Sequence, residues 1–334
     1  MKFHFDFDIK KIPWNIEHTH KLFLIGSCFT ENIGEKLRRH KFNVLENPNG
    51  ILFNPVSVAE AVTSYIENKE TLASELFHLN EGWHSWNHHS RFSAASREEA
   101  LEKINTSTQK ANQYLKNADY IFITLGSSWI YTLTELAENA VHGAVAANNH
   151  KAPSNWFNRR LMNAEEVLRV LDNMIHRLFY FNPSIKIIFT ISPVRHLREG
   201  VVENNRSKAV LIQTVHHLVD KFEGLYYFPA YELVIDDLRD YRFYAEDLVH
   251  PNYFATEYVW EKFCLACMNE STRKLMEEIR TVNLAYKHKP FNSDSEQHQK
   301  FLNATLEKTK GLKEQFPFLD FEKEIKYFQT GQKE

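Results

Sequence analysis

Short apolar segments alternate with amphipathic helical segments along most of this chain. Apolar residues spaced three or four apart predict helices over residues 30–40, 56–68, 164–181, 203–222 and 252–278. The apolar runs between them predict strands over 22–25, 42–45, 120–124, 185–191 and 225–228. This alternation is typical of an α/β protein, so we expect a mostly parallel sheet with helices on both faces.

The composition is that of a globular protein with a large core. Of 334 residues, 43% are hydrophobic and 25% are charged, which suits one large domain or a domain with an appendage. The formal net charge of −3 gives no field that favours nucleic acid or an anionic membrane. The chain shows neither a signal peptide nor the roughly 18 apolar residues of a membrane span, so we expect a cytoplasmic protein with no membrane partner.

Polar residues gather where the predicted strands end. In chain order these are Gly26-Ser27, Asn49-Gly50, Gly126 to Ser128, Ser192 to His196, and Asp247 with His250. Open α/β sheets bind ligands beyond the carboxyl ends of their strands. The sequence therefore predicts a site at that edge of the sheet.

The first and last of these segments suggest the chemistry of a serine hydrolase. Ser27 follows the first strand, and Asp247 and His250 lie three residues apart before Pro251. One class of serine hydrolase assembles its triad in this way, because a serine hydroxyl needs a base to remove its proton. The alternatives are that Ser27 is a helix N-cap, a position that favours serine, and that Asp247 and His250 belong to a plain loop before a helix.

Five segments taken together carry a family resemblance. They are Gly26 to Thr30, Asn47 to Pro55, Leu125 to Trp129, Ser192 to His196, and Asp240 to Pro251. In combination they resemble the GSCFA domain family, a branch of the SGNH/GDSL hydrolase-like proteins, over about residues 20 to 270. The resemblance implies a flavodoxin-like three-layer α/β/α sandwich that hydrolyses an ester. It also implies that Ser27 is the nucleophile, that His250 is the base and acid, and that Asp247 orients the imidazole. We expect no metal and no cofactor.

The resemblance further implies an oxyanion hole. Its donors would be the N–H groups of Ser27 and Gly50, and an asparagine in a Gly-x-Asn segment of the wider superfamily. This chain has Gly126-Ser127-Ser128 at that point, so we expect the hydroxyl of Ser127 or Ser128 to replace the amide, with Asn49 and Asn149 as the alternatives. The residues expected to contact the substrate are Asn49, Trp129, Arg195 and His196.

Other reactive side chains have less specific interpretations. Cys28 is a rival nucleophile, although most such cysteines are buried packing residues. Cys264-x-x-Cys267 has the spacing of a redox or zinc motif, but it lies in an apolar helical run and favours two buried thiols. The segment Trp83 to His89 is rich in histidine and tryptophan, and we expect an irregular aromatic lid there rather than a metal site.

These observations predict an SGNH-type serine esterase that acts on an acylated small molecule or an acetylated saccharide. We expect this domain to span residues 1–275, with a helical C-terminal extension over 276–334. One alternative is a non-catalytic carbohydrate-binding module on the same fold, and another is an interaction scaffold built on the extension. The sequence does not specify the acyl group, the alcohol or the oligomeric state.

Overall fold

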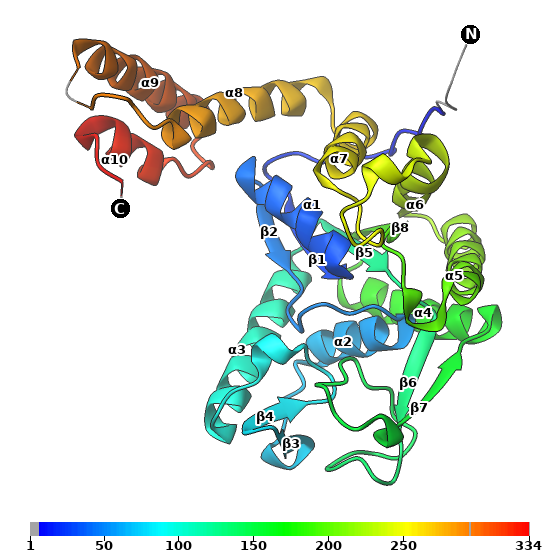
Figure 1. The fold of residues 1–334 in the computed structure, drawn as a ribbon. Coiled ribbons are helices and arrows are strands. Elements are labelled where there is room, and N and C mark those ends of the chain that lie inside the picture. The colour runs from blue at the N-terminus through cyan, green and yellow to red at the C-terminus, as the bar shows by residue number, and fades with distance from the viewer. Residues whose placement is uncertain (1–6, 294, 334) are drawn as a thin grey trace.

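The computed structural model describes residues 7–293 and 295–333, and it confirms a parallel sheet flanked by helices (Figure 1). The sheet has the order β2-β1-β5-β8-β9, and each neighbouring pair of strands is parallel. Its strands are β1 (Lys21–Gly26), β2 (Asn43–Glu46), β5 (Tyr120–Leu125), β8 (Lys186–Ile191) and β9 (Leu225–Tyr227). This is the flavodoxin-like order, which reverses direction between β1 and β5.

Helices cover both faces of the sheet, as the three-layer sandwich requires. Figure 1 shows α1 and α7 on one side of the sheet, with α2 and α3 on the other. The helices on the α2 side are α2 (Pro55–Glu67), α3 (Arg97–Lys116), α4 (Ala164–Phe181) and α5 (Val201–Lys221). Those on the opposite side are α1 (Cys28–Arg39), the short α6 (Ala230–Glu232) with a π-helical turn over Leu233–Leu238, and α7 (Tyr253–Cys267).

The alternation of side chains along each strand builds these two cores. In β1, Phe23 and Ile25 pack with α2 and α3, whereas Leu22 and Leu24 pack with α1 and α7. All four side chains are almost completely buried. A strand buried on both faces is a continuous apolar run, which is why the sequence identifies these strands so clearly.

Helix boundaries follow local capping signals. The start of α2 is as expected, because Asn54 accepts a hydrogen bond from the N–H of Ser57 and Pro55 occupies the first turn. The single helix expected over 252–278 is wrong. The chain breaks after Cys267, and Asn269 caps a new helix, α8 (Glu270–Lys287), by accepting from the N–H of Thr272.

Two antiparallel hairpins extend the sandwich on the α2 side, and the sequence did not predict them. They are β3 (Leu76–Leu79) with β4 (Gly82–Ser85), and β6 (Trp129–Leu133) with β7 (Phe157–Leu161). We expected an irregular lid over Trp83 to His89. This prediction is wrong for Trp83 to Ser85, which belong to strand β4. Trp86 stacks on Phe77 with ring centres 3.7 Å apart, so it belongs to a small core of its own.

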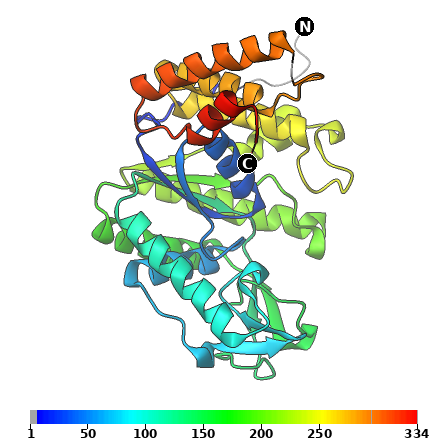
Figure 2. The same cartoon turned by 90° about the vertical axis from the view of Figure 1, so that its left-hand side faces the viewer.

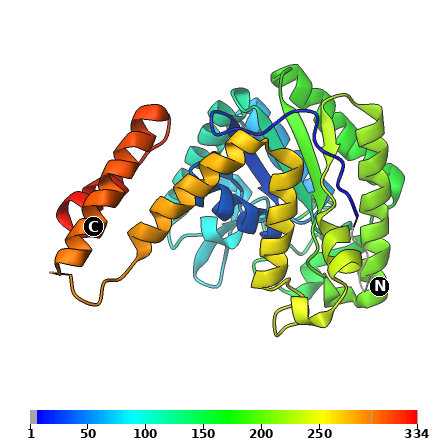
Figure 3. The same cartoon turned by 90° about the horizontal axis from the view of Figure 1, so that it is seen from above.

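The C-terminal helices form a separate layer to one side of the sandwich (Figures 2 and 3). α8, α9 (Glu296–Gln315) and α10 (Glu322–Thr330) share an apolar cluster around Ile279, Leu302 and Phe328. Lys41 of the sandwich pairs with Glu324 at 2.9 Å and lies over the ring of Phe321. The expected boundary at residue 276 lies within α8 and stays a prediction.

No helix in the described part of the chain is long and apolar enough to span a membrane.

Three buried histidines should make stability depend on pH. Burial lowers the pKa of His88 to about 3 and those of His18 and His150 to about 4. Between these values and the ordinary value of about 6.5 the unfolded chain binds more protons, so stability falls as pH falls. We expect the free energy of unfolding in urea to drop by several kcal/mol from pH 7 to pH 4, at about 1.4 kcal/mol per unit of pKa depression.

A pair of variants separates this effect from general acid denaturation. His88→Gln should flatten the pH dependence, whereas His217→Gln, on the exposed side of α5, should leave it unchanged. Equal pH dependence in the wild type and in His88→Gln would contradict the assignment.

Candidate active site

Ser27 lies where β1 ends, at the point where the order of the sheet reverses. The turn requires Gly26, which has a φ of +142° and on which a Cβ would meet the Thr124 carbonyl oxygen at 2.2 Å. Ser27 precedes α1, but its hydroxyl does not cap that helix. The Oγ atom is buried and has no hydrogen-bond partner among the described residues. Because an unpaired buried hydroxyl costs about 1–3 kcal/mol, this is a feature to expect of a functional group.

Asp247 and His250 form a hydrogen-bonded pair. His250 Nδ1 lies 2.6 Å from Asp247 Oδ2, and the backbone N–H groups of Val249 and His250 donate to Asp247 Oδ1 at 2.9 and 3.0 Å. The N–H and the imidazole of His250 lower the pKa of the Asp247 carboxyl to about 2. Both side chains are about half exposed. The carboxylate therefore fixes the imidazole through Nδ1 and leaves Nε2 for another partner.

Arg195 anchors the loop that carries this pair. It extends from the end of β8, where its N–H donates to the Val249 carbonyl at 3.2 Å and its guanidinium donates to the Leu248 carbonyl at 3.0 Å. The guanidinium also lies 4.1 Å from the centre of the Tyr244 ring. The structure thus ties Arg195 to the loop itself, and its expected contact with substrate stays a prediction.

The structure describes a pair and a separate serine rather than a connected triad. Ser27 Oγ is not hydrogen-bonded to His250, and the two residues come from the ends of different segments of the fold. The triad of Ser27, His250 and Asp247 therefore stays a prediction, of which one link, the contact between Asp247 and His250, is present.

The two expected backbone donors of the oxyanion hole already have acceptors. The N–H of Ser27 donates to the Thr124 carbonyl at 3.1 Å, and the N–H of Gly50 donates to the Asn47 carbonyl at 2.7 Å. Gly50 has a φ of +81°, and a Cβ there would meet the Cβ of His89 at 2.2 Å. The turn therefore needs glycine for its shape, and the roles of Ser27 and Gly50 as oxyanion donors stay predictions.

The hydroxyls of Ser127 and Ser128 face α5. Both lie 3.2 Å from the hydroxyl of Ser207, and Ser128 also donates to the Ser207 carbonyl at 3.1 Å. The N–H of Ser128 in turn donates to the Ser207 hydroxyl at 2.7 Å. This network joins the end of β5 to α5, so both hydroxyls have a structural role, and their role as oxyanion donors stays a prediction.

A different amide, that of Asn47, lies beside Ser27. Its Oδ1 accepts from the N–H of Gly26 at 2.9 Å, which fixes the orientation of the amide group. Asn47 is fully buried, and its Nδ2 has no hydrogen-bond partner within the described residues. The Thr30 hydroxyl is likewise buried without a partner, and the N–H of Thr30 donates to the Ser27 carbonyl at 2.9 Å. Three residues linked through this turn thus each have a buried polar atom with no partner among the described residues.

Sequence reasoning missed Asn47 because it was considered only as part of a turn. The segment Asn47-Pro48-Asn49-Gly50 signals a turn, and nothing in it shows which amide faces inward. In the structure the side chain of Asn49 instead joins this turn to neighbouring segments. Its amide donates to the Asn87 carbonyl at 3.0 Å and accepts from the Tyr65 hydroxyl at 2.7 Å.

The remaining expected substrate contacts lie at the start of β6 and after β8. Trp129 is partly buried, and its Nε1 has no hydrogen-bond partner in the described part of the chain. His196 Nε2 lies 3.0 Å from Glu199 Oε2, and burial lowers the pKa of the imidazole. Both residues lie at the predicted edge of the sheet, and their contact with substrate stays a prediction.

Lys208 of α5 is a further residue that the sequence analysis did not single out. Its Nζ donates to the Gly126 and Ser192 carbonyls, both at 2.6 Å, so it joins the ends of β5 and β8. Burial lowers the pKa of this ammonium to about 7. The sequence contains a signal that Lys208 is buried. It lies on the same face of the helix as the buried residues Asn204, Ser207 and Leu211, at helical spacings of three and four.

The cysteines are packing residues in this structure. Cys264 and Cys267 are buried in α7, and burial raises the pKa of both thiols, which agrees with the expectation of two buried helical thiols. Burial also raises the pKa of Cys28, which weakens its case as a nucleophile. Within the described residues no group of three or more His, Cys, Asp or Glu side chains is placed to hold a metal.

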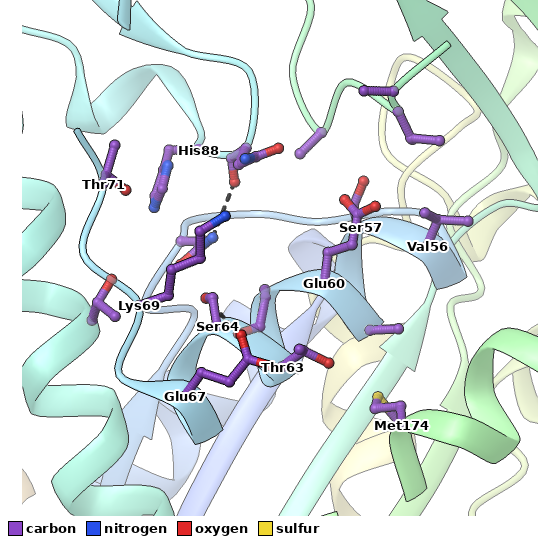
Figure 4. Close-up of a pocket in the computed structure, with 18 of the residues that line it drawn as sticks. Val56, Ser57, Glu60, Thr63, Ser64, Glu67, Lys69, Thr71, His88 and Met174 are labelled. Carbon is purple, nitrogen blue, oxygen red and sulfur yellow. Dashed lines mark hydrogen bonds between the residues drawn. The ribbon is translucent and has the colours of Figure 1, made fainter. Parts of the chain in front are cut away.

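A cavity of about 550 Å³ lies over α2, away from the serine (Figure 4). Its lining includes Ser57, Glu60 and Ser64 from α2, together with Lys69 and His88. Burial raises the pKa of Glu60. None of Ser27, Asp247 and His250 lines this cavity.

The chain belongs to the GSCFA family. The model of the GSCFA family matches residues 21–263, and that of the GSCFA domain protein, C-terminal domain, matches residues 279–334. The family resemblance seen in the sequence is therefore confirmed. No curated protein matches the sequence.

Solved structures with a similar arrangement include several esterases. A carbohydrate esterase family 3 from Talaromyces cellulolyticus is 9% identical with a TM-score of 0.36, over 79% of this chain and 99% of that one. A Clostridium thermocellum family 3 carbohydrate esterase is 8% identical with a TM-score of 0.36, over 77% and 97%. An acetyl xylan esterase from Butyrivibrio proteoclasticus is 11% identical with a TM-score of 0.35, over 79% and 64%.

Proposed function

We propose that this protein is a serine esterase of the SGNH type, with Ser27 as nucleophile, His250 as base and acid, and Asp247 as the residue that orients His250. The observation that carries the proposal is the 2.6 Å contact between Asp247 and His250, together with a buried Ser27 hydroxyl that has no hydrogen-bond partner among the described residues. Membership of the GSCFA family supports it.

The proposed reaction has two steps. Ser27 Oγ attacks the carbonyl carbon of an ester while His250 Nε2 takes the hydroxyl proton, and the alcohol leaves with that proton. Water then attacks the acyl group on Ser27, gives a proton to His250, and releases the acid as the Ser27 hydroxyl regains its proton. Asp247 stays ionised throughout and stabilises the imidazolium that forms in each step.

We propose that Asn47 Nδ2 supplies the oxyanion donor that the Gly-x-Asn asparagine supplies elsewhere in the superfamily. Its Oδ1 is held by the N–H of Gly26, so the amide is oriented before a substrate arrives. Its unpaired Nδ2 is buried beside the turn that carries Ser27. By contrast, the hydroxyls of Ser127 and Ser128 already contact Ser207.

The substrate class we propose is an acylated small molecule or an acetylated saccharide. Exposed aromatic rings lie near His250 in the sequence, namely Tyr241, Tyr253 and Phe254, which are 65%, 68% and 70% exposed. Flat aromatic rings suit the apolar faces of sugars.

A second candidate is a carbohydrate-binding module without turnover. The observation that favours it is that the N–H groups of Ser27 and Gly50 are both engaged by backbone carbonyls. A binding module needs no oxyanion hole, so these hydrogen bonds would then be permanent.

Covalent labelling tests the nucleophile. A fluorophosphonate probe should react with Ser27, because a hydroxyl near a general base attacks phosphorus as it attacks a carbonyl. Mass spectrometry should place the adduct on the peptide that contains Ser27. Ser27→Ala should abolish the labelling and Cys28→Ser should preserve it. An adduct on Cys28 would make Cys28 the nucleophile and contradict the triad, and no adduct at all would favour the binding module.

The pair of Asp247 and His250 predicts graded losses of activity. His250→Ala should lower the rate of ester hydrolysis by about 10²–10⁴, and Asp247→Asn should lower it less. Glu246→Gln, an exposed neighbour, serves as the control and should keep full activity. Since the pKa of Asp247 is about 2, its protonation should not limit activity above about pH 4. Wild-type activity in His250→Ala would rule out the assignment.

Asn47→Asp tests the proposed oxyanion donor. The substitution keeps an acceptor for the N–H of Gly26 but removes the Nδ2 donor, so kcat should fall by about 10²–10³. Circular dichroism and the urea midpoint are measured alongside, because a carboxylate at this buried position also costs stability. Asn32→Asp adds the same charge on the exposed face of α1 and should leave kcat unchanged. Equal losses in both variants would show an effect of charge alone and would contradict the role of Asn47.

A further inference from the structure

A second cavity of about 550 Å³ has a strongly basic lining. It lies beside hairpin β6–β7 and the loop after β8, and its polar lining residues are Tyr131, Asn149, Lys151, Ser154, Arg159 and Arg198. No Asp or Glu is among its lining residues in the described part of the chain. This cavity is separate from the one over α2 and does not include Ser27, Asp247 or His250.

A buried carboxylate behind the cavity holds two of these side chains in place. The side chain of Glu199 is only 3% exposed, and its Oε1 accepts from the Tyr131 hydroxyl at 2.8 Å and from Arg159 Nη1 at 3.3 Å. One side of the Arg159 guanidinium is thus fixed, and the side chain is still 49% exposed. A guanidinium held in this way loses less conformational entropy when it binds an anion.

The other two cations approach from separate segments. Arg198 belongs to the 3₁₀ turn after β8, and its guanidinium lies 5.0 Å from the centre of the Tyr131 ring. Lys151 has a φ of +58° and follows His150, whose φ is +47°. Two consecutive non-glycine residues in the left-handed region are strained, and such strain is frequent at binding sites. The imidazole of His150, 2.8 Å from the Ser85 carbonyl, fixes this turn.

We propose that this cavity binds the oxyanion group of a small molecule, either a carboxylate or a phosphate. Three cationic side chains line one hollow, and the carboxylate of Glu199, which contacts Tyr131, Arg159 and His196, offsets one of their charges. The three cations and this carboxylate leave an excess of two positive charges. Guanidinium groups match planar or tetrahedral oxyanions with two parallel hydrogen bonds. Asn149 and Ser154 add neutral groups that can donate to further oxygens.

Calorimetric titration of the full-length protein at low salt tests this site directly and needs no turnover. The probes are inorganic phosphate and glucuronate, with glucose as the neutral counterpart of glucuronate. We expect binding of at least one anion, no comparable binding of glucose, and weaker affinity at high salt because the attraction is electrostatic. Binding of phosphate alone assigns a phosphate site, and binding of glucuronate alone assigns a carboxylate site.

Charge-neutral variants connect the binding to this cavity. Arg198→Gln and Lys151→Gln, both on the exposed rim, should each weaken the Kd by about tenfold or more. Arg169→Gln on α4 and Lys116→Gln on α3 remove exposed cations elsewhere and should leave the Kd unchanged. The proposal is overturned if neither anion binds, if glucose binds as tightly as glucuronate, or if the pocket variants match the controls. None of these outcomes depends on esterase activity, so the two proposals fail separately.

Discussion

The close approach of Gly26 to Thr124 is the contact on which the candidate active site depends. The carbonyl of Thr124 accepts from the N–H of Ser27 at 3.1 Å, in a space that would otherwise hold the Cβ of any residue other than glycine. Gly26 also accepts from the N–H of Leu52 at 3.0 Å and donates to Asn47. One residue thus joins β1, β5 and the turn after β2. Because these are backbone contacts, the position of Ser27 is set by the sheet and does not depend on a flexible side chain.

Lys208 imposes a second constraint on the same edge of the sheet. A buried ammonium is costly, and this one is stabilised by the carbonyls of Gly126 and Ser192 rather than by a carboxylate. These carbonyls follow β5 and β8, so the lysine fixes the two strand ends relative to α5. The contacts of Ser127 and Ser128 with Ser207 fix the same junction. The short hydroxyls of both serines thus stay against the helix.

The sequence predicted the sheet and the local contact between Asp247 and His250, but it did not predict the pairing of β6 with β7 or the break between α7 and α8. Strands such as β1 and β5 are apolar on both faces, which makes them recognisable without knowledge of their neighbours. Residues three apart in one loop meet through local geometry alone. By contrast, β6 pairs with β7 across a long insertion. The strand Phe157–Leu161 contains two exposed arginines, so its sequence lacks the apolar pattern that predicts a strand. The break between α7 and α8 was missed because apolar spacing continues through it, and only the Asn269 cap marks it.

The choice between an esterase and a binding module rests on the cost of freeing the N–H of Ser27. Exchanging one backbone acceptor for a substrate oxygen costs about the net value of one hydrogen bond, roughly 1 kcal/mol. A donor in an oxyanion hole stabilises the transition state by about 2.7–4 kcal/mol, so the exchange is favourable once charge develops on that oxygen. The Asn47 amide needs no such exchange, because Nδ2 has no hydrogen-bond partner among the described residues. A ligand that remained neutral would gain little from this arrangement, whereas a tetrahedral oxyanion would satisfy Nδ2 and compete for the N–H of Ser27. The unpaired atoms around Ser27 therefore favour chemistry over simple binding.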